Sequence, residues 1–365
     1  MTCLPKTIKP VHNLATPFNK QSPLVSIIVV NWNGLKTVEQ CLDSLLTQSY
    51  PNCEIILVDN HSEDGSREKI ETFYGKKATL LLNDRNEGFA GGNNKGIKAS
   101  KGAYIALLNN DAWADRNWIS SLVSVAEKDS KIGMCASKIY LAREENLIDN
   151  TGHLIYPDGL SWGRGRLETD KGQYDIEEEV IFPSGCAALY KKEMLDEIGL
   201  FDERFFAYCE DTDLGLRGRI LGWKCVYSPQ AIVYHYFSGS TSQASPLKAF
   251  LVERNRGWVA IKNFPMIYLL KSPGYTLQRL LWQAYGAISG AGIAGEYVQK
   301  NSFLSGVCIL LKAWFHMVLG IPKMLTDRAN LFRKKKISSK EVGSLLKRYQ
   351  VSARVIAFGN RRDRS

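Results

Sequence analysis

Four short apolar segments, each followed by polar residues, constrain the fold of this chain most strongly. They occupy residues 25–30, 54–58, 78–82 and 104–108. The first is an almost continuous β-branched run, which suits a strand that is buried on both faces of a sheet. Helical patterns lie between the segments, and strands that alternate with helices form right-handed βαβ units. The sequence therefore predicts an α/β fold in which helices flank a mostly parallel sheet.

The chain beyond residue 130 predicts further elements of the same kind. The segment from residue 141 to 179 is polar and contains glycine, which predicts hairpins or long loops. The other expected elements are strands at 131–140, 180–190, 224–227 and 232–236, and a short helix at 191–198 that Gly199 ends.

Polar side chains gather just beyond the carboxyl end of each early strand. Open α/β sheets bind ligands in the crevice at that edge. Each loop in isolation favours a simple turn, and the glycine-rich loop at 83–94 lacks both the Walker lysine and a complete GxGxxG pattern. Because four such loops converge on one edge, we predict that they bind a ligand together. The predicted residues are Asn31, Asn33, Asp59, Asn60, Asn86, Gly91, Asn110 and Asp111.

A second candidate site is the acidic stretch that contains Glu210, Asp211 and Asp213, directly after a run of aromatic residues. Carboxylates this close repel one another unless a cation, an arginine or a shared proton offsets the repulsion. Partial burial and acidic neighbours raise the proton affinity of a carboxylate, so one of the three could act as a general base. The alternative is that Asp211 or Thr212 only caps the helix that follows.

Asp111 and His235 are the candidate metal ligands. Asp111 offers a hard oxygen to Mg²⁺ or Mn²⁺, ions that complete their shell with water and substrate phosphates. A lone histidine at the end of a strand is usually a core residue, but a Ser/Gly-rich loop at 238–242 closely follows His235. A metal on a diphosphate and one base are the minimum for displacing a nucleotide from a sugar. A glycosidase would instead need two opposed carboxylates.

Together these motifs resemble those of family 2 glycosyltransferases, most closely the rhamnosyltransferase-like branch. The resemblance implies a GT-A fold and inverting, metal-dependent transfer of a sugar from a nucleotide donor, with dTDP-rhamnose the leading donor. The implied acceptor is a hydroxyl of a cell-surface glycan or a lipid-linked oligosaccharide. The resemblance covers about residues 25–265, and its segments are 25–33, 58–66, 86–93, 107–111, 199–206, 210–214 and His235.

The resemblance also implies roles for individual residues. Asp211 would be the catalytic base, and Asp59 would contact the base or ribose of the nucleotide. Asn109, Asn110 and Asp111 stand at the DXD position of the family, so Asp111 is the only carboxylate left to contact the metal and diphosphate. The residues that would complete the site are His235 on the metal or diphosphate, and Glu210, Asp213 and Trp113 at or near the acceptor.

Charge and hydropathy divide the chain into four parts. These are a proline-rich leader at 1–24, the glycosyltransferase-like domain at 25–265, an apolar and amphipathic helical region at 266–322, and a basic tail at 323–365. The tail carries 13 Lys and Arg against 3 Asp and Glu, which accounts for the whole net charge of +10. We expect the helical region to lie in a membrane interface and the tail to contact anionic lipid.

Other interpretations of these regions exist. The helical region could pack on the catalytic domain, join a homo-oligomer or span the membrane as a hairpin. Basic tails also bind nucleic acid, but the neutral remainder of this chain argues against that partner. A sugar-phosphate nucleotidyltransferase would need a basic, glycine-rich loop after the first strand, which residues 31–34 do not supply. Eight scattered cysteines and the absence of a signal-like leader favour the cytoplasm, at the inner face of the cell membrane.

Overall fold

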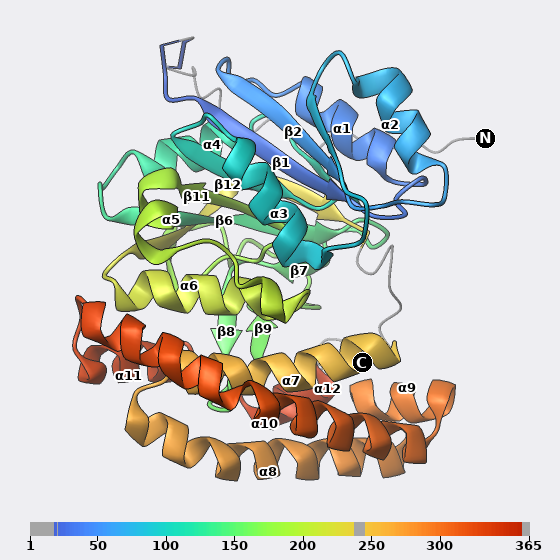
Figure 1. The fold of residues 1–365 in the computed structure, drawn as a ribbon, viewed down its shortest axis with the longest axis vertical. Coiled ribbons are helices and arrows are strands. Elements are labelled where there is room, and N and C mark those ends of the chain that lie inside the picture. The colour runs from blue at the N-terminus through green and yellow to red at the C-terminus, as the bar shows by residue number, and fades with distance from the viewer. Residues whose placement is uncertain (1–17, 20, 237–244, 360–365) are drawn as a thin grey trace.

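A mixed β-sheet forms the centre of the molecule (Figure 1). The computed structural model describes residues 18–19, 21–236 and 245–359, so most of the expected leader and the loop at 238–242 lie outside the described residues. The strands are β1 (Val25–Asn31), β2 (Cys53–Asp59), β3 (Thr79–Leu82), β4 (Tyr104–Leu108), β5 (Ala112–Ala114), β6 (Ile132–Leu141), β7 (Ile148–Asn150), β8 (His153–Ile155), β9 (Ser161–Gly163), β10 (Glu178–Val180), β11 (Ala187–Lys191) and β12 (Lys224–His235).

The strand order confirms the predicted α/β architecture. Within the described chain the main sheet runs β10-β12-β6-β11-β4-β1-β2-β3, with β5 beside β12 and β7 beside β6. Strands β4, β1, β2 and β3 are parallel neighbours, as are β6 and β12. Strand β11 lies antiparallel between β4 and β6. The carboxyl ends of β1, β2 and β4 therefore meet at one edge, as predicted.

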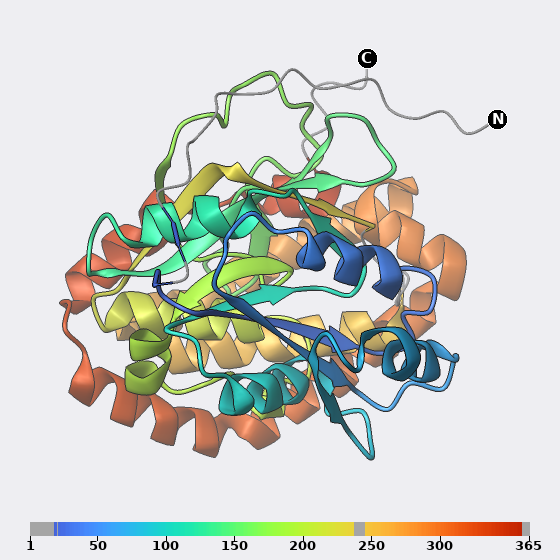
Figure 2. The ribbon, with the colours of Figure 1, turned by 90° about the horizontal axis from the view of Figure 1, so that it is seen from above.

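Helices cover both faces of this sheet. Figure 2 shows α1 and α4 on one side of the strands and α3 on the other, and the two buried apolar clusters divide in the same way. The helices are α1 (Val38–Leu46), α2 (Ser66–Tyr74), α3 (Gly88–Ala99), α4 (Trp118–Ala126), α5 (Lys192–Ile198), α6 (Glu210–Ile220), α7 (Pro246–Asn263), α8 (Met266–Ser289), α9 (Gly292–Asn301), α10 (Phe303–Lys334), α11 (Ser339–Arg348) and α12 (Ala353–Phe358).

Two strand predictions are wrong in detail. The single strand expected at 180–190 is two strands, because Val180 pairs with β12 whereas Ala187 begins the pairing with β4. Pro183 lies between them, and a proline cannot donate to a central ladder. Conversely, the strands expected at 224–227 and 232–236 are one strand, β12, which a register shift between Ser228 and Ile232 interrupts.

The glycine-rich segment predicted as a loop is mostly the helix α3. Its glycines allow the helix to lie directly on β1, because a Cβ atom at Gly92 would be 2.7 Å from Val30 Cγ1 and one at Gly96 would be 2.6 Å from Ile28 Cγ2. Gly91 lies in this helix, one turn from its start. The glycine pattern therefore reflects close helix–sheet packing.

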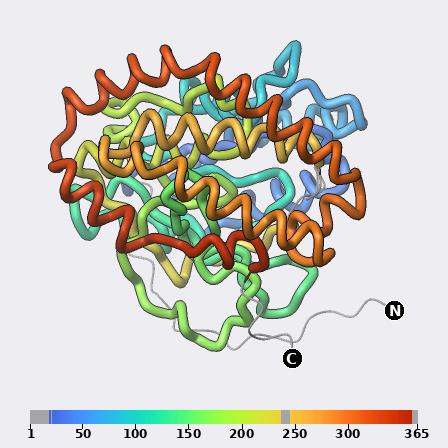
Figure 3. The backbone as a smooth tube through the Cα atoms, turned by 90° about the horizontal axis from the view of Figure 1, so that it is seen from below, coloured from blue at the N-terminus to red at the C-terminus, as the bar shows by residue number. Residues whose placement is uncertain are grey.

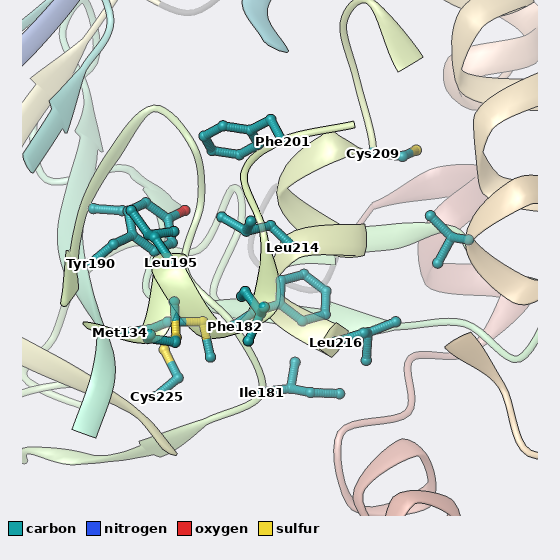
Figure 4. Close-up of a cluster of buried hydrophobic side chains, with 14 of the residues drawn as sticks. Met134, Ile181, Phe182, Tyr190, Leu195, Phe201, Cys209, Leu214, Leu216 and Cys225 are labelled. Carbon is teal, nitrogen blue, oxygen red and sulfur yellow. The ribbon is translucent and has the colours of Figure 1, made fainter. Parts of the chain in front are cut away.

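A buried apolar cluster joins the sheet to α5 and α6 (Figure 4). Met134 of β6, Tyr190 of β11 and Cys225 of β12 contribute from the sheet side, and Leu214 and Leu216 contribute from α6. Burying such side chains stabilises a fold by roughly 1.5–3 kcal/mol each. This cluster fixes α6, and with it the acidic stretch at the start of α6.

The C-terminal helices form a layer beside α6, on the far side from most of the sheet (Figure 1). The boundary expected at residue 322 falls inside α10, which continues without a break to Lys334. Met324 and Leu331 are buried at helical spacing, and Arg328 between them is also buried, where its Nη1 donates to the carbonyl of Ile261 (3.0 Å). Residues 323–359 of the basic tail are also folded, since Val342 and Leu346 of α11 are buried.

A buried ionic cluster anchors α8 to the rest of the molecule. Arg279 of α8 bonds to Asp158 (Nε–Oδ2 2.7 Å), which lies in the turn between β8 and β9. Arg279 also bonds to Glu253 of α7 (Nη2–Oε2 2.9 Å), and Arg256 pairs with both acids. Removing one member would leave an unpaired buried charge, which is strongly destabilising. The cluster therefore fixes α7, α8 and the β8–β9 hairpin to one another.

Candidate active site

The predicted residues near β1, β2 and α3 form a buried network of side-chain hydrogen bonds. Asn31 Nδ2 donates to Asp59 Oδ1 (3.1 Å), and Asn110 Nδ2 donates to Asn31 Oδ1 (2.9 Å). Asn60 Nδ2 donates to Asn86 Oδ1 (2.9 Å) and to the carbonyl of Gly88 at the start of α3. Asp59 is fully buried and also accepts from the backbone of Ser62. These side chains hold the loops in register with one another.

Asn33 and Trp113 lie at the rim of this region. Asn33 has a left-handed backbone (φ 50°), and its Oδ1 accepts from the backbone of Glu63 (2.9 Å). Trp113 stacks on Tyr234 at a centroid distance of 5.4 Å and lines an open depression of about 510 Å³ beside α1. The two residues are therefore accessible from the edge where the strands end.

His235 lies between two carboxylates. Its Nδ1 donates to Asp149 Oδ2 (2.8 Å), and its Nε2 is 3.2 Å from Asp111 Oδ1. Burial alone lowers the pKa of His235, but its contacts with the Cys186 sulfur, Asp111 and Asp149 raise that pKa well above its ordinary value. The structure thus brings Asp111 and His235 together, as predicted.

Asp149 of β7 was not identified from the sequence. It orients the imidazole so that Nε2 faces Asp111, the arrangement in which a carboxylate fixes a metal-binding histidine. Asp111 Oδ1 and His235 Nε2 therefore converge on one point, which fits a Mg²⁺ or Mn²⁺ ion that takes its other ligands from water and phosphate. No group of three or more His, Cys, Asp or Glu suited to a metal occurs within the described residues, so a metal held here would depend on substrate oxygens.

Asp211 lies at the start of α6, where its carboxylate remains partly accessible. Its Oδ2 accepts from the backbone N–H of Gly185 (3.0 Å), and its Oδ1 accepts from the N–H of Thr212 (2.6 Å). His153 Nε2 is 3.7 Å from Oδ2, beyond hydrogen-bond distance. Burial lowers the pKa of His153, although the charge of the nearby Asp211 opposes this shift. The lowered pKa favours a neutral imidazole. The Asp211 side chain is 15% exposed.

A short strand connects the two halves of the site. Asp149, which holds His235, is followed directly by Asn150, whose Nδ2 is 3.5 Å from His153 Nε2. His153 in turn lies beside Asp211. Asp111 and Asp211 are therefore connected through His235, the adjacent β7 residues Asp149 and Asn150, and His153.

The other two acids of the stretch are not equivalent to Asp211. Asp213 is fully buried and pairs with Arg217 (Oδ2–Nε 2.9 Å) and Lys262 (Oδ2–Nζ 3.0 Å). Glu210 is also buried, and burial together with the charge of Asp211 raises its pKa well above the ordinary value. Asp213 is thus a structural anion, whereas the surroundings of Glu210 favour its protonated form.

Two cations that the sequence analysis missed lie near Asp149. Arg166 Nη1 bonds to Asp149 Oδ1 at 2.6 Å. Lys248 lies over the ring of Tyr208 (5.2 Å), and burial and the charge of Arg166 lower its pKa to about 8, although Asp149 opposes the shift. Neither residue belongs to a recognisable motif. Arg166 lies in the long excursion after β7, and Lys248 lies in the first turn of α7.

The backbone before Asp211 is strained, and a side chain of another helix stabilises it. Phe206, Tyr208 and Cys209 all have φ near +66°, a region that costs non-glycine residues free energy. Asn255 of α7 is fully buried, and its Nδ2 contacts the carbonyl oxygens of Phe205 (2.9 Å), Ala207 (2.9 Å) and Tyr208 (2.7 Å). This amide therefore stabilises the turn that aims Asp211.

The comparisons with known proteins agree with this geometry. Residues 26–199 match the family model described as Glycosyl transferase family 2. This segment of the chain is therefore similar to a family 2 glycosyltransferase domain. Residues 200–235, which include Asp211 and His235, lie beyond the matched segment but are built into the same sheet and site.

Curated relatives of this glycosyltransferase domain are bacterial. A glycosyltransferase of Rickettsia typhi is 34% identical over 200 residues, which is 54% of this chain and 58% of the relative. This chain thus spans little more than half the length of that relative. An N-acetylglucosaminyl-diphospho-decaprenol L-rhamnosyltransferase of Mycobacterium tuberculosis is 27% identical over 272 residues, covering 64% of this chain and 86% of the relative.

A solved structure supports the fold assignment. The glycosyltransferase GalNAc-T7, crystallised with UDP, GalNAc and Mn²⁺, superposes with a TM-score of 0.56 at 18% identity, over 68% of this chain and 49% of that one. At this identity the likeness concerns the fold alone. Together with the sheet topology, it shows that the domain has the GT-A-like architecture expected from the sequence.

The carbonyl contacts of Asn255 predict a local effect. Replacing Asn255 with Ala removes one donor from each of three carbonyls in the strained turn, so we expect faster amide hydrogen exchange in residues 205–213 and a loss of about 1–3 kcal/mol in the free energy of unfolding. Asn330→Ala, on the exposed face of α10, is the control and should change neither quantity. Unaltered exchange in residues 205–213 of the Asn255 variant would show that the amide does not hold the turn.

Proposed function

We propose that this protein transfers a sugar from a nucleotide donor to an acceptor hydroxyl with inversion at the anomeric carbon. The observation that carries the proposal is the placement of Asp211 and the Asp111–His235 pair, which are connected through β7 and His153. A diphosphate beside Asp111 and His235 would place the attached sugar toward Asp211. Direct displacement needs this arrangement, a leaving group on one side and a base on the other.

Asp211 is proposed to act as the general base. Its carboxylate is accessible, and the Gly185 and Thr212 amides fix its direction. The acceptor hydroxyl loses its proton to Asp211 while its oxygen bonds to the anomeric carbon, and the bond from that carbon to the diphosphate oxygen breaks. Glu210 and Asp213 do not compete for this role, since Glu210 is buried with a raised pKa and Asp213 is paired with Arg217 and Lys262.

The diphosphate is proposed to lie among the cations near Asp149. A divalent ion bound by Asp111 and His235 would neutralise the charge that develops on the leaving diphosphate. Arg166 and Lys248 lie close to the same group and can bind phosphate oxygens through charge-assisted hydrogen bonds. The GalNAc-T7 structure, which holds UDP and Mn²⁺, supports a metal here by analogy of fold.

The proposed donor is dTDP-rhamnose, and the proposed acceptor is a lipid-linked sugar. Both follow from the resemblance to the rhamnosyltransferase-like branch and from the mycobacterial relative, whose name specifies an L-rhamnosyl transfer to a sugar on diphospho-decaprenol. Titrating the purified protein with a panel of nucleotide sugars, with and without Mn²⁺, tests the donor. Binding of dTDP-rhamnose no tighter than that of the other nucleotide sugars would refute this assignment.

The base assignment predicts a selective loss of turnover. Asp211→Asn removes the proton acceptor but keeps the side-chain volume, so transfer should fall by about 10²–10⁴-fold while calorimetry shows unchanged donor binding. Asp196→Asn, an exposed carboxylate on α5, serves as the control. Transfer at the wild-type rate by the Asp211 variant would exclude this residue as the base.

The orientation of His235 predicts a role for Asp149 in metal binding. Asp149→Asn weakens the hydrogen bond that holds the imidazole, so we expect Mn²⁺ affinity in the presence of nucleoside diphosphate to fall about 10–100-fold. Isothermal titration with Mn²⁺ measures this directly, and Asp129→Asn on the surface is the control. Equal Mn²⁺ affinity of the wild type and the Asp149 variant would contradict a role of His235 in metal binding.

We also propose that the protein binds the membrane surface through its C-terminal helices. By length and composition α10 is the one helix of the described chain that could cross a membrane, and only 6% of its apolar window is buried. Phe315 and Leu319 of α10 are more than half exposed, and the same helix carries the exposed basic residues Lys312 and Arg333 on either side of them in the sequence. An amphipathic surface of this kind suits the interface of an anionic membrane.

This surface predicts lipid binding. Replacing both Phe315 and Leu319 with Ser should lower binding to phosphatidylglycerol-containing vesicles about tenfold or more, because each side chain loses its burial in the lipid interface. The matched control replaces the exposed Phe73 and Leu35 with Ser, far along the chain from these helices. Identical sedimentation of both double variants with vesicles would contradict the proposal.

A further inference from the structure

A large cavity lies between α8 and α12. Its volume is about 1310 Å³, and aromatic and aliphatic side chains form much of its lining. Trp282 and Tyr285 of α8 meet Phe358 of α12 edge to face, at centroid distances of 6.0 and 6.1 Å. Such a lining favours an apolar ligand with a long and flexible shape.

The cavity is continuous with an exposed apolar surface. Leu281 and Tyr285 line it and are nevertheless 63% and 61% exposed. Most of the exposed large hydrophobic side chains in the described chain lie on α8, α9 and α10, the helices that Figure 3 shows crossing the underside of the molecule. A ligand that enters the cavity could therefore come directly from a lipid phase.

The β8–β9 hairpin connects this cavity to Asp211. His153, at the start of β8, lies beside Asp211. Three residues further along the chain, about 10 Å in an extended strand, Tyr156 Oη donates to Gln278 Oε1 (2.8 Å). Gln278 lines the cavity, and Figure 1 shows the hairpin between α6 and the C-terminal helices. The cavity and Asp211 thus lie at the two ends of one short hairpin.

Charge at the cavity suits a phosphorylated lipid. Arg354 of α12 lines the cavity and is exposed, and no ion pair to it occurs among the residues that the structure describes. A guanidinium is well suited to phosphate oxygens.

We propose that this cavity binds the polyisoprenoid chain of a lipid-linked acceptor, with Arg354 near the phosphate-bearing end of that chain. The inference rests on the proposed function and adds a site for the part of the acceptor that does not react. The sugar and diphosphate of such an acceptor lie between its reacting hydroxyl and its chain, and the β8–β9 hairpin provides the corresponding separation between Asp211 and the cavity. A long chain binds more tightly than a short one, because each buried methylene contributes to affinity.

A pair of adjacent substitutions tests this site. Ser289→Trp adds a large ring to the lining, whereas Ile288→Trp adds the same ring to a neighbouring position that is 84% exposed and outside the lining. The acceptors are N-acetylglucosaminyl-diphospho-decaprenol and the same head group on a short geranyl chain. We expect Ser289→Trp to raise KM for the decaprenyl acceptor about tenfold, the loss of two or three buried methylene groups, and to leave KM for the geranyl acceptor unchanged.

The control and a binding measurement make the result decisive. Ile288→Trp should leave both KM values unchanged, and an equal effect of the two substitutions would overturn the proposal. Photo-cross-linking with a diazirine-bearing decaprenyl phosphate does not require turnover. We expect labelled peptides from residues 278–291 and 352–359. The Ser289→Trp and Arg354→Ala variants should carry less label. Label confined to α10, as for a lipid on the outer surface, would overturn it. Normal cross-linking without transfer to either acceptor would refute the proposed function and leave the cavity assignment standing.

Discussion

The contact on which the site depends most is that of His235 with two carboxylates. Asp149 holds one nitrogen and Asp111 lies at the other, so one imidazole joins the end of β12, the end of β4 and the short strand β7. Burying an imidazole and two carboxylates costs free energy unless the three groups are paired with one another. Since β7 continues through Asn150 toward His153 and Asp211, the same contact also sets the position of the proposed base relative to the proposed diphosphate site.

The C-terminal helices complete the catalytic side of the domain. Lys262 and Asn263 of α7 bond to Asp213, and Asn255 of the same helix contacts the strained turn before Asp211. Helix α10 packs along α7, where Trp314 Nε1 donates to Glu253 (2.9 Å). The helices proposed to meet the membrane are therefore connected to the turn that orients Asp211 through a single helix, α7. The proposed lipid-binding surface and the proposed acceptor site thus share one structural framework.

Sequence patterns predicted the parallel half of the sheet well, because buried β-branched strands such as β1 have a local signature. They also predicted that Asp111 and His235 meet. They could not predict Asp149, His153 or Asn255, since each acts through a contact with a distant segment and none stands in a motif. Hydropathy likewise did not indicate that α10 continues past residue 322, because charged residues there lie among buried apolar ones such as Met324 and Leu331.

A crystal structure of the protein with dTDP and Mn²⁺ would test the central claim most directly. The account predicts that the diphosphate lies against Asp111 and His235, with Arg166 or Lys248 on its oxygens. It also predicts that the accessible oxygen of Asp211 faces the position that the sugar would occupy next to the outer phosphate. A diphosphate bound elsewhere, or an Asp211 carboxylate that points away from it, would contradict the account.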